Sequence, residues 1–311
     1  MNLIKILEEK TLIPQYELIK FASTAPHRYK EFDIPKRNGK GVRHIAQPSK
    51  ELKFFQRIIV SHLSKILPVH KKATAYKAQV GIKENALIHR ANTFILKVDF
   101  ENFFPSIKPI VLFSIFNKHN IILDETDEFL LEKLLFKKDK KNRHSYLSIG
   151  SPSSPFISNC IMYFFDVEAD KICENRGIKY SRYADDITLS TNKKNNLFDL
   201  PDLLGEILKK ELIGLIKINK EKTVFSSKRH NRHITGVTLS NNGELSLGRN
   251  RKRLISSMVH RFSLGQLDGM QTSKLQGLIS FSYYIEPSFL DRLKLKYGLN
   301  IIEKIRNANL L

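Results

Sequence analysis

The stretch that decides the fold is residues 181–190, which read Ser181-Arg182-Tyr183-Ala184-Asp185-Asp186-Ile187-Thr188-Leu189-Ser190. Residues that favour strands stand on both sides of Ala184-Asp185-Asp186, so the stretch predicts two short strands joined by a tight turn. Paired aspartates in a turn usually serve the turn itself, because Asp tolerates left-handed backbone and bonds to its own main chain. The pair becomes a candidate metal site only if another strand brings a third carboxylate beside it.

Residues 93–100 supply such a strand, Thr93-Phe94-Ile95-Leu96-Lys97-Val98-Asp99-Phe100. Most of these residues are apolar and favour strands, which predicts a buried strand closed by Asp99. Neighbouring strands would bring Asp99 close to Asp185 and Asp186. Nucleotidyl transfer uses two divalent cations about 4 Å apart, and hard cations prefer carboxylate oxygens. The three aspartates are therefore the candidate catalytic and metal-binding residues.

The rest of the chain predicts an α+β fold. Helices are expected at residues 49–67, where Ser49 caps the start, at 152–176 and at 203–212. A strand is expected at residues 215–218. A basic turn at residues 35–41 joins two extended pieces. Strand, helix, strand-turn-strand, helix and strand in this order predict a mainly antiparallel sheet covered by helices. After about residue 246 the chain reads as basic helices to its end.

The charge balance points to a polyanionic partner. The chain has 52 Lys and Arg against 31 Asp and Glu, a formal net charge of +21. Nucleic acid is the favoured partner, while a solvated basic face and a membrane surface are the alternatives. No apolar run is long enough to span a membrane, and residues 1–10 alternate Leu and Ile with Lys and Glu, unlike a signal peptide, so we expect a cytoplasmic protein. Cys160 and Cys173 are too few for a disulfide framework or a cysteine zinc site and are expected in the core.

Tyr183-Ala184-Asp185-Asp186 resembles the catalytic turn of reverse transcriptases. Four further segments resemble motifs of that family in the family's order: the basic turn with Arg43, Val98 to Ile107, Gly150 to Pro155, and Asn219 to Thr223. The resemblance spans about residues 30–240. It implies a right-hand polymerase with fingers, a palm built on an antiparallel sheet, and a helical thumb. The expected division is 1–95 for N-terminal helices and fingers, 96–245 for a palm with inserted fingers near 105–150, and 246–311 for a basic thumb.

The resemblance also assigns roles at the chemical centre. Asp99, Asp185 and the backbone carbonyl of Phe100 would hold two Mg²⁺ ions, for which Mn²⁺ could substitute, and Asp186 would complete the acidic cluster. Lys222 would protonate the leaving pyrophosphate, although an ordinary surface lysine is the alternative. The expected activity is that of an RNA-directed DNA polymerase.

The nucleotide site follows in the same way. Arg43 with Lys36 or Lys40 would neutralise the triphosphate, and Gly150 belongs to the loop beneath the templating base. Phe104 would lie under the sugar C2′ and exclude a hydroxyl, while core packing beside Phe103 is the alternative. The chain departs from the family at Ile149, where reverse transcriptases usually have Gln. We expect this departure to alter fidelity or nucleotide affinity without abolishing activity.

Two more segments resemble signatures of retron reverse transcriptases. Asn85-Ala86-Leu87-Ile88-His89 resembles Asn-Ala-x-x-His, and Ile234-Thr235-Gly236 resembles Val-Thr-Gly, although His89 could equally be a core histidine. With the basic residues Arg251, Lys252 and Arg253, these segments are the candidate RNA-binding residues.

The retron resemblance implies a set of partners and a role. The partners are a structured non-coding RNA, its single-stranded DNA product, dNTPs and an effector protein. DNA synthesis would begin at a guanosine 2′-hydroxyl of the RNA and give a branched hybrid that serves antiphage defence. An intron-derived or abortive-infection reverse transcriptase, or an RNA-binding scaffold with a vestigial site, is the alternative.

Overall fold

A four-stranded antiparallel sheet forms the centre of the molecule in the computed structural model, which describes residues 1–36, 39, 41–140 and 144–308. Its strands lie in the order β6 (Lys179–Tyr183), β7 (Asp186–Thr191), β3 (Phe94–Phe100) and β8 (Ile218–Ser227). Each neighbouring pair is antiparallel. The mainly antiparallel sheet expected from the sequence is thereby confirmed, with the acid-ended strand β3 directly beside the hairpin strand β7.

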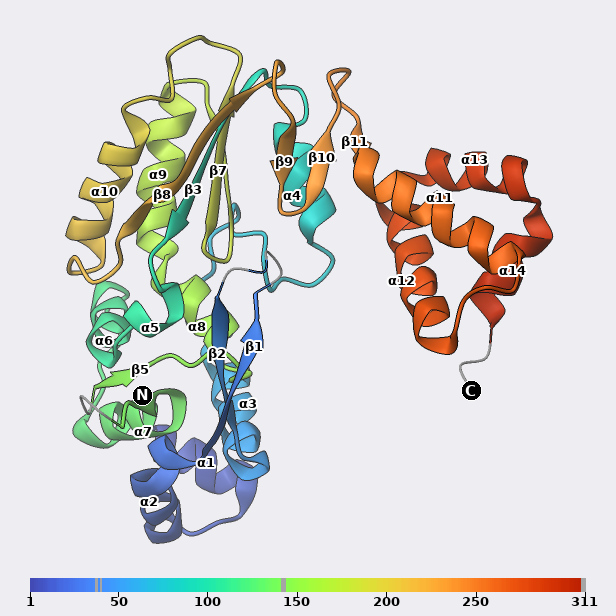
Figure 1. Cartoon of the computed structure of the whole chain (residues 1–311). Coiled ribbons are helices and arrows are strands. Elements are labelled where there is room, and N and C mark those ends of the chain that lie inside the picture. Colours follow the sequence, from blue (N-terminus) through green and yellow to red (C-terminus); the bar gives the residue numbers. More distant parts are fainter. Residues whose placement is uncertain (37–38, 40, 141–143, 309–311) are drawn as a thin grey trace.

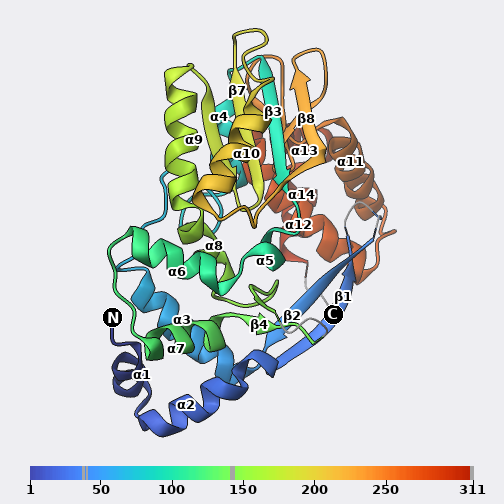
Figure 2. The same ribbon diagram turned by 90° about the vertical axis from the view of Figure 1, so that its left-hand side faces the viewer.

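Helices cover both faces of this sheet. Helices α9 (Tyr163–Asn175) and α10 (Leu200–Glu211) lie on one face, and α4 (Ile82–His89) lies on the other (Figures 1 and 2). The single helix expected at 152–176 is wrong, because α8 (Ser154–Ile161) ends at the fully buried Met162 before α9 begins. The break lets α8 pack against α6 while α9 packs against β6.

The expected strand at 215–218 is misplaced. Left-handed backbone at Ile213 (φ 58°) and Gly214 (φ 68°) forms a turn after α10, and β8 starts only at Ile218. The motif Asn219 to Thr223 therefore lies within β8, beside the end of β3, rather than after a strand.

The N-terminal half adds a helical body and a projecting hairpin. The body comprises α1 (Leu3–Thr11), α2 (Gln15–Thr24), the 3-10 turn Ala25–His27, α3 (Lys50–Leu63), α5 (Phe103–Ser106), α6 (Pro109–Lys118), α7 (Glu125–Leu135) and the short strands β4 (Lys137–Lys138) and β5 (Ser145–Tyr146). Helix α3 begins as expected, since the Ser49 hydroxyl accepts the Leu52 N–H at 3.3 Å. The hairpin of β1 (Tyr29–Pro35) and β2 (Val42–Pro48) projects from this body along one side of the molecule (Figure 2). The body shares one hydrophobic core with the sheet.

A second core belongs to the C-terminal part. Strands β9 (Arg232–Ile234), β10 (Val237–Leu239) and β11 (Leu245–Ser246) lead into α11 (Arg249–Ser263), α12 (Gly269–Ile285), α13 (Pro287–Tyr297) and α14 (Leu299–Asn307). Figure 1 shows the four helices standing apart from the sheet, connected through these strands. Ile234, Val237 and Leu239 share the core of the helices, so this core begins before the residue-246 boundary that the sequence suggested.

The structure also bears on the expectations about membrane-spanning segments and about the two cysteines. No helix in the described ranges is long and apolar enough to cross a membrane. Cys160 and Cys173 are free thiols in the core, as expected.

Candidate active site

The turn that carries the paired aspartates is a two-residue hairpin turn. Tyr183 pairs with Asp186, so Ala184 and Asp185 alone connect β6 to β7. Ala184 takes left-handed backbone with φ 57°, and two-residue hairpins need positive φ in their turns to match the twist of the strands. Asp185 consequently occupies the tip of the hairpin. Both expected strands are confirmed.

The third aspartate comes from the neighbouring strand. The β3–β7 register ends with Val98 opposite Ile187, and one further step along both strands places Asp99 beside Asp186. Asp99 and Asp186 line a cavity of about 980 Å³, and Asp185 lines an adjoining cavity of about 470 Å³. Lys222 borders both cavities. We call these two cavities together the catalytic cleft.

The aspartates of the cleft perturb one another. Burial, followed by the charges of Asp185 and Asp99, raises the pKa of Asp186 to about 6, while Lys97 and Lys222 act in the opposite sense. Burial and the charge of Asp99 also raise the pKa of Asp185. Asp186 is exposed at the cavity wall, so solvent moderates its shift. The cleft therefore holds carboxylates whose charges repel, an arrangement that a bound cation relieves.

Lys222 reaches this centre because β8 bulges. Lys97 pairs with Val224 while Asp99 pairs with Asn219, which loops residues 220–223 out of the ladder. The Asn219 side chain accepts the Lys222 N–H at 3.2 Å and holds the bulge. Lys222 Nζ then donates to Asp99 Oδ1 at 3.0 Å. The motif Asn219 to Thr223 thus folds into a bulge that places the Lys222 ammonium group beside Asp99.

The donor set fits hard divalent cations, although the site is not a closed cage. Across the described ranges, no three His, Cys, Asp or Glu side chains converge on one point, and Asp99 is paired with Lys222. The cleft offers three neighbouring carboxylates that line its cavities, and carboxylates are ligands of the kind that Mg²⁺ and Mn²⁺ prefer. The Phe100 ring is buried in the core, so only its main chain could take part.

The hairpin β1–β2 brings cations to the same cleft. Lys36 and Arg43, on either side of its turn, border both cavities. Lys40 lies outside the described residues. The positions of Lys36 and Arg43 agree with the expected triphosphate contact, which nevertheless stays a prediction.

The smaller cavity contains the expected sugar-site residue. Phe104 is half-buried and lines this cavity together with Asp185 and Ile149. Its ring also packs edge-on against Phe103, with 5.4 Å between centroids. Both interpretations of Phe104, a sugar contact and core packing, therefore find a structural basis.

Gly150 has a packing role in this loop. It has φ 125°, and a Cβ there would lie 2.9 Å from the Ala46 carbonyl oxygen of β2. The adjacent Ile149 carbonyl accepts the Ala46 N–H at 2.9 Å. The glycine allows the loop to approach β2, and its neighbours Ser148 and Ile149 reach the cavity. The expected nucleotide contact of Gly150 would therefore be indirect.

Sequence reasoning missed Lys97 and His233, which also line the larger cavity. Lys97 precedes Asp99 by two residues, so both point to one face of β3. A lysine within an otherwise apolar strand was the signal that could have identified it. His233 gave no such signal, because β9 reaches the cleft only through tertiary packing.

The RNA contacts expected of Asn85, His89 and Ile234 stay predictions, and the structure places all three side chains in the fully buried interior. His89 bonds through Nδ1 to Ser190 (2.7 Å) and through Nε2 to Ser181 (2.8 Å), and burial lowers its pKa to about 3. It is a neutral core histidine joining α4 to both hairpin strands.

Asn85 extends the same buried contacts toward the C-terminal part. Its Oδ1 accepts the hydroxyls of Ser181 (2.6 Å) and Thr74 (3.1 Å), and its Nδ2 donates to Thr235 Oγ1 at 3.4 Å. The two retron-like segments therefore touch each other. Thr235 and Gly236 are the members that reach the wall of the cleft.

The three basic residues proposed for RNA contact differ in their surroundings. Arg251 donates to the Gly236 carbonyl at 3.1 Å, and Lys252 pairs with Glu286 at 2.6 Å. Arg253 is exposed on α11. Of the three, Arg253 is the side chain best placed to meet a nucleic acid.

Comparison with known proteins identifies the family. The family model described as "Reverse transcriptase (RNA-dependent DNA polymerase)" matches residues 34–239. The chain is 43% identical to the Retron Ec83 reverse transcriptase of Escherichia coli over 299 residues, covering 94% of each chain. It is 29% identical to the Retron Ec86 reverse transcriptase of Escherichia coli, covering 98% of this chain and 94% of the relative.

A solved structure supports the fold. Telomerase from Candida albicans, in complex with a fragment of telomeric RNA, superposes with a TM-score of 0.50 at 15% identity, covering 96% of this chain and 60% of the telomerase. At that identity the likeness concerns the right-hand polymerase fold alone. The family match over the central sheet and the near full-length retron relative place the chain among the retron reverse transcriptases, which are RNA-directed DNA polymerases.

Proposed function

We propose that this reverse transcriptase copies part of a structured non-coding RNA into single-stranded DNA at a centre formed by Asp99, Asp185 and Asp186. The observation that carries the proposal is the catalytic cleft itself. Strand β3 and the β6–β7 hairpin supply the three carboxylates, the β8 bulge supplies Lys222, and the β1–β2 hairpin supplies Lys36 and Arg43.

The proposed chemistry divides the work among these residues. Asp99, Asp185 and the Phe100 carbonyl would hold two Mg²⁺ ions, or Mn²⁺ in their place, with Asp186 adding charge nearby. Bound there, the ions would lower the pKa of the attacking hydroxyl and neutralise the phosphates. Lys36, Arg43 and Lys40 would hold the triphosphate of the incoming dNTP through their positive charge.

Two further residues act on the leaving group and the sugar. Lys222 would give a proton to the departing pyrophosphate, and its 3.0 Å contact with Asp99 keeps the ammonium at the chemical centre. Phe104 would close the space under C2′ of the nucleotide. Both assignments rest on position in the cleft and on the family motifs.

Membership of the retron family supports the rest of the proposal. The DNA would remain joined to its RNA through a guanosine 2′-hydroxyl, and the hybrid would act with an effector protein in antiphage defence. We name residues 1–95, together with the insertion at 105–150, the fingers. The rest of residues 96–245 is the palm, and residues 246–311 are the thumb. The thumb would carry the RNA-binding surface.

The test of the catalytic centre is Asp185→Asn, which removes one charge and keeps the shape of the side chain. DNA synthesis with Mg²⁺ should fall by roughly 10³-fold or more. Thermal stability should hold or rise, because Asp185 is repelled by Asp99. Asp202→Asn, an exposed carboxylate on α10, is the matched control and should extend primers normally.

Primer extension by the purified Asp185→Asn protein at the wild-type rate would overturn the assignment. A wild-type protein that binds RNA but makes no DNA would favour the inactive scaffold. The nucleic acid that co-purifies with the wild-type protein tests the product. A short DNA that stays linked to RNA after denaturation is expected, and only free RNA beside an active polymerase would remove the branched hybrid from the proposal.

A further inference from the structure

A buried ion pair lies directly beneath the catalytic turn. Arg182 and Asp166 are both fully buried, and the guanidinium donates to the carboxylate twice, from Nε at 2.8 Å and from Nη2 at 2.6 Å. Asp166 belongs to α9 and Arg182 to β6, two residues before the turn begins. The pair fixes the plane of the guanidinium against the helix.

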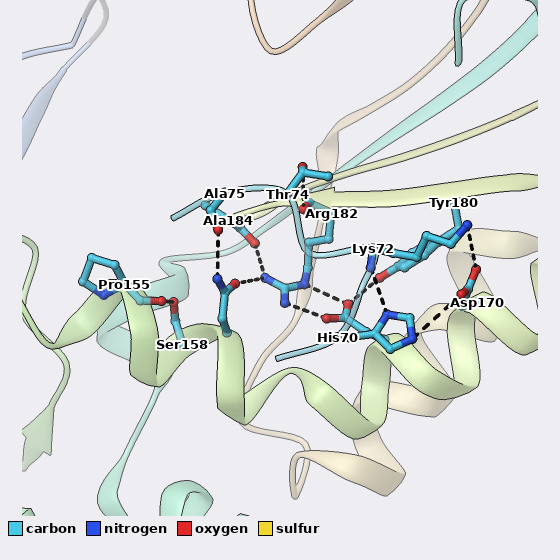
Figure 3. A network of polar contacts seen from close by, with 12 residues as sticks. His70, Lys72, Thr74, Ala75, Pro155, Ser158, Asp170, Tyr180, Arg182 and Ala184 are labelled. Atoms are coloured by element: carbon cyan, nitrogen blue, oxygen red, sulfur yellow. Dashed lines mark hydrogen bonds and ion pairs between the residues drawn. The ribbon is translucent and has the colours of Figure 1, made fainter. Parts of the chain in front are cut away.

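The remaining nitrogen of Arg182 reaches the turn. Nη1 donates to the Ala184 carbonyl at 2.9 Å and to Asn159 Oδ1 at 3.1 Å (Figure 3). The Ala184 carbonyl belongs to the same planar peptide unit as the Asp185 N–H, so holding one sets the direction of the other. That peptide leads directly into the Asp185 backbone that carries the carboxylate. Arg182 is thus connected to the catalytic carboxylate through a single peptide plane.

Other contacts hold Arg182 and its partners in place. Tyr180 donates to Asp166 Oδ1 at 2.6 Å, and Asn159 donates to the Ala75 carbonyl at 2.9 Å. The loop before α4 binds the main chain of Arg182 through two hydrogen bonds. The Arg182 N–H donates to the Lys72 carbonyl at 3.0 Å, and the Arg182 carbonyl accepts the Thr74 N–H at 2.8 Å (Figure 3). The guanidinium is consequently fixed from the helix, the strand and the loop.

The energetics of such a pair point to geometry as its purpose. Burying two charges costs desolvation free energy, and apolar residues of the same size often give equal or greater stability. The turn, in contrast, needs support, since Ala184 holds a left-handed conformation that disfavours side chains with a Cβ. The Arg182 guanidinium supplies that support by donating a hydrogen bond to the Ala184 carbonyl.

We propose that Arg182 is the positioning residue of the catalytic turn: anchored by Asp166, it holds the Ala184–Asp185 peptide in the orientation that presents Asp185 to the cleft. The proposal rests on the proposed function only for the catalytic role of Asp185. Its structural part, a turn ordered by one guanidinium, can be measured without catalysis.

The test is Arg182→Lys, which keeps a positive charge beside Asp166 but lacks the fork that binds helix and turn together. Amide hydrogen exchange of the turn peptide should become at least several-fold faster. The turnover number of DNA synthesis should fall roughly 10- to 100-fold, with a higher Mg²⁺ concentration at half-maximal rate and unchanged affinity for primer–template. Binding of Mn²⁺, followed by electron paramagnetic resonance, should weaken in parallel.

Gln56→Leu is the control, because it removes a buried hydrogen bond to the Leu134 carbonyl (2.9 Å) in the helical body and touches neither Arg182 nor its partners. It should lower the melting temperature but leave exchange at the turn and Mg²⁺ dependence as in the wild type. If both variants lose activity in proportion to lost stability, the pair is only structural and the proposal fails.

A second variant covers the case in which Arg182→Lys does not fold. The double change Asp166→Leu with Arg182→Met replaces the pair by apolar side chains of similar size. It should fold with a loosened turn and reduced turnover, and wild-type exchange and turnover in it would overturn the proposal. An active Asp185→Asn would instead overturn the proposed function while leaving faster exchange in Arg182→Lys unaffected.

Discussion

At the scale of single residues, Phe104 has two roles to separate. It lines the cavity of Asp185 and also packs against Phe103. Phe104→Val opens space under the sugar and should raise ribonucleotide use relative to deoxynucleotide use by roughly 10-fold or more, because a steric exclusion is removed. Steady-state incorporation of matched dNTP and rNTP pairs measures the ratio.

Phe116→Leu is the control for this prediction. Phe116 is fully buried in α6 and lines neither cavity of the cleft, so its truncation should cost about 1–2 kcal/mol of stability and leave the sugar ratio unchanged. A Phe104→Val protein with an unchanged ratio and a lower melting temperature would assign Phe104 to the core alone.

His89 makes a second prediction at this scale, about pH. Burial lowers its pKa to about 3 in the folded chain, well below the ordinary histidine value of about 6.5, so between these values the unfolded state binds the extra proton. Stability is therefore lost as the pH falls below about 6.5, and this group alone should remove about 2 kcal/mol between pH 7 and 5. His89→Gln should be less stable at pH 7 yet lose less on acidification. Equal losses in denaturant unfolding at the two pH values would show that His89 is not held neutral.

At the scale of elements, some basic side chains of α11 are exposed to solvent and others form contacts within the protein. Arg249 and Arg253, four residues apart, are exposed on one side of the helix, whereas Lys252 is bound to Glu286. If α11 meets RNA, changing both arginines to Gln should weaken binding and lower the slope of log affinity against log salt by about 1–2, because fewer counterions are released. Filter binding across a salt series measures the slope.

Lys252→Gln serves as the matched change on the same helix. It breaks a partly buried pair, so it should lower the melting temperature and leave the salt slope unaltered. A double arginine variant with the wild-type slope would place RNA recognition elsewhere, for example at Thr235 and Gly236 on the wall of the cleft.

At the scale of the whole molecule, α4 links the sheet to the C-terminal helices. Its buried face bonds to the catalytic hairpin through His89 and to Thr235 through Asn85. Its outer face meets α12, where Tyr284 donates to Glu84 Oε2 at 2.9 Å. Because the same helix contacts both parts, it links the C-terminal helices to the hairpin through the buried His89 and Asn85 on one side and the exposed Tyr284–Glu84 contact on the other.

Local sequence determined the catalytic hairpin. Strand-forming residues around Ala184-Asp185-Asp186, and an apolar strand that ends in an acid, predicted β6, β7 and β3 because periodicity and turn chemistry act over a few residues. The same holds for the Ser49 cap of α3. The helix at 152–176 was predicted too long because only packing on two different neighbours breaks it at Met162.

The tertiary structure decided what the motif residues touch. Asn85 and His89 carry polar side chains that a sequence reader assigns to RNA, yet the fold buries them as hydrogen-bonded links between elements about 100 residues apart. Lys222 meets Asp99 only because β8 bulges, and Arg182 supports the turn only because α9 places Asp166 beneath it. Contacts between distant segments depend on the register and packing of whole elements, which local sequence patterns do not encode.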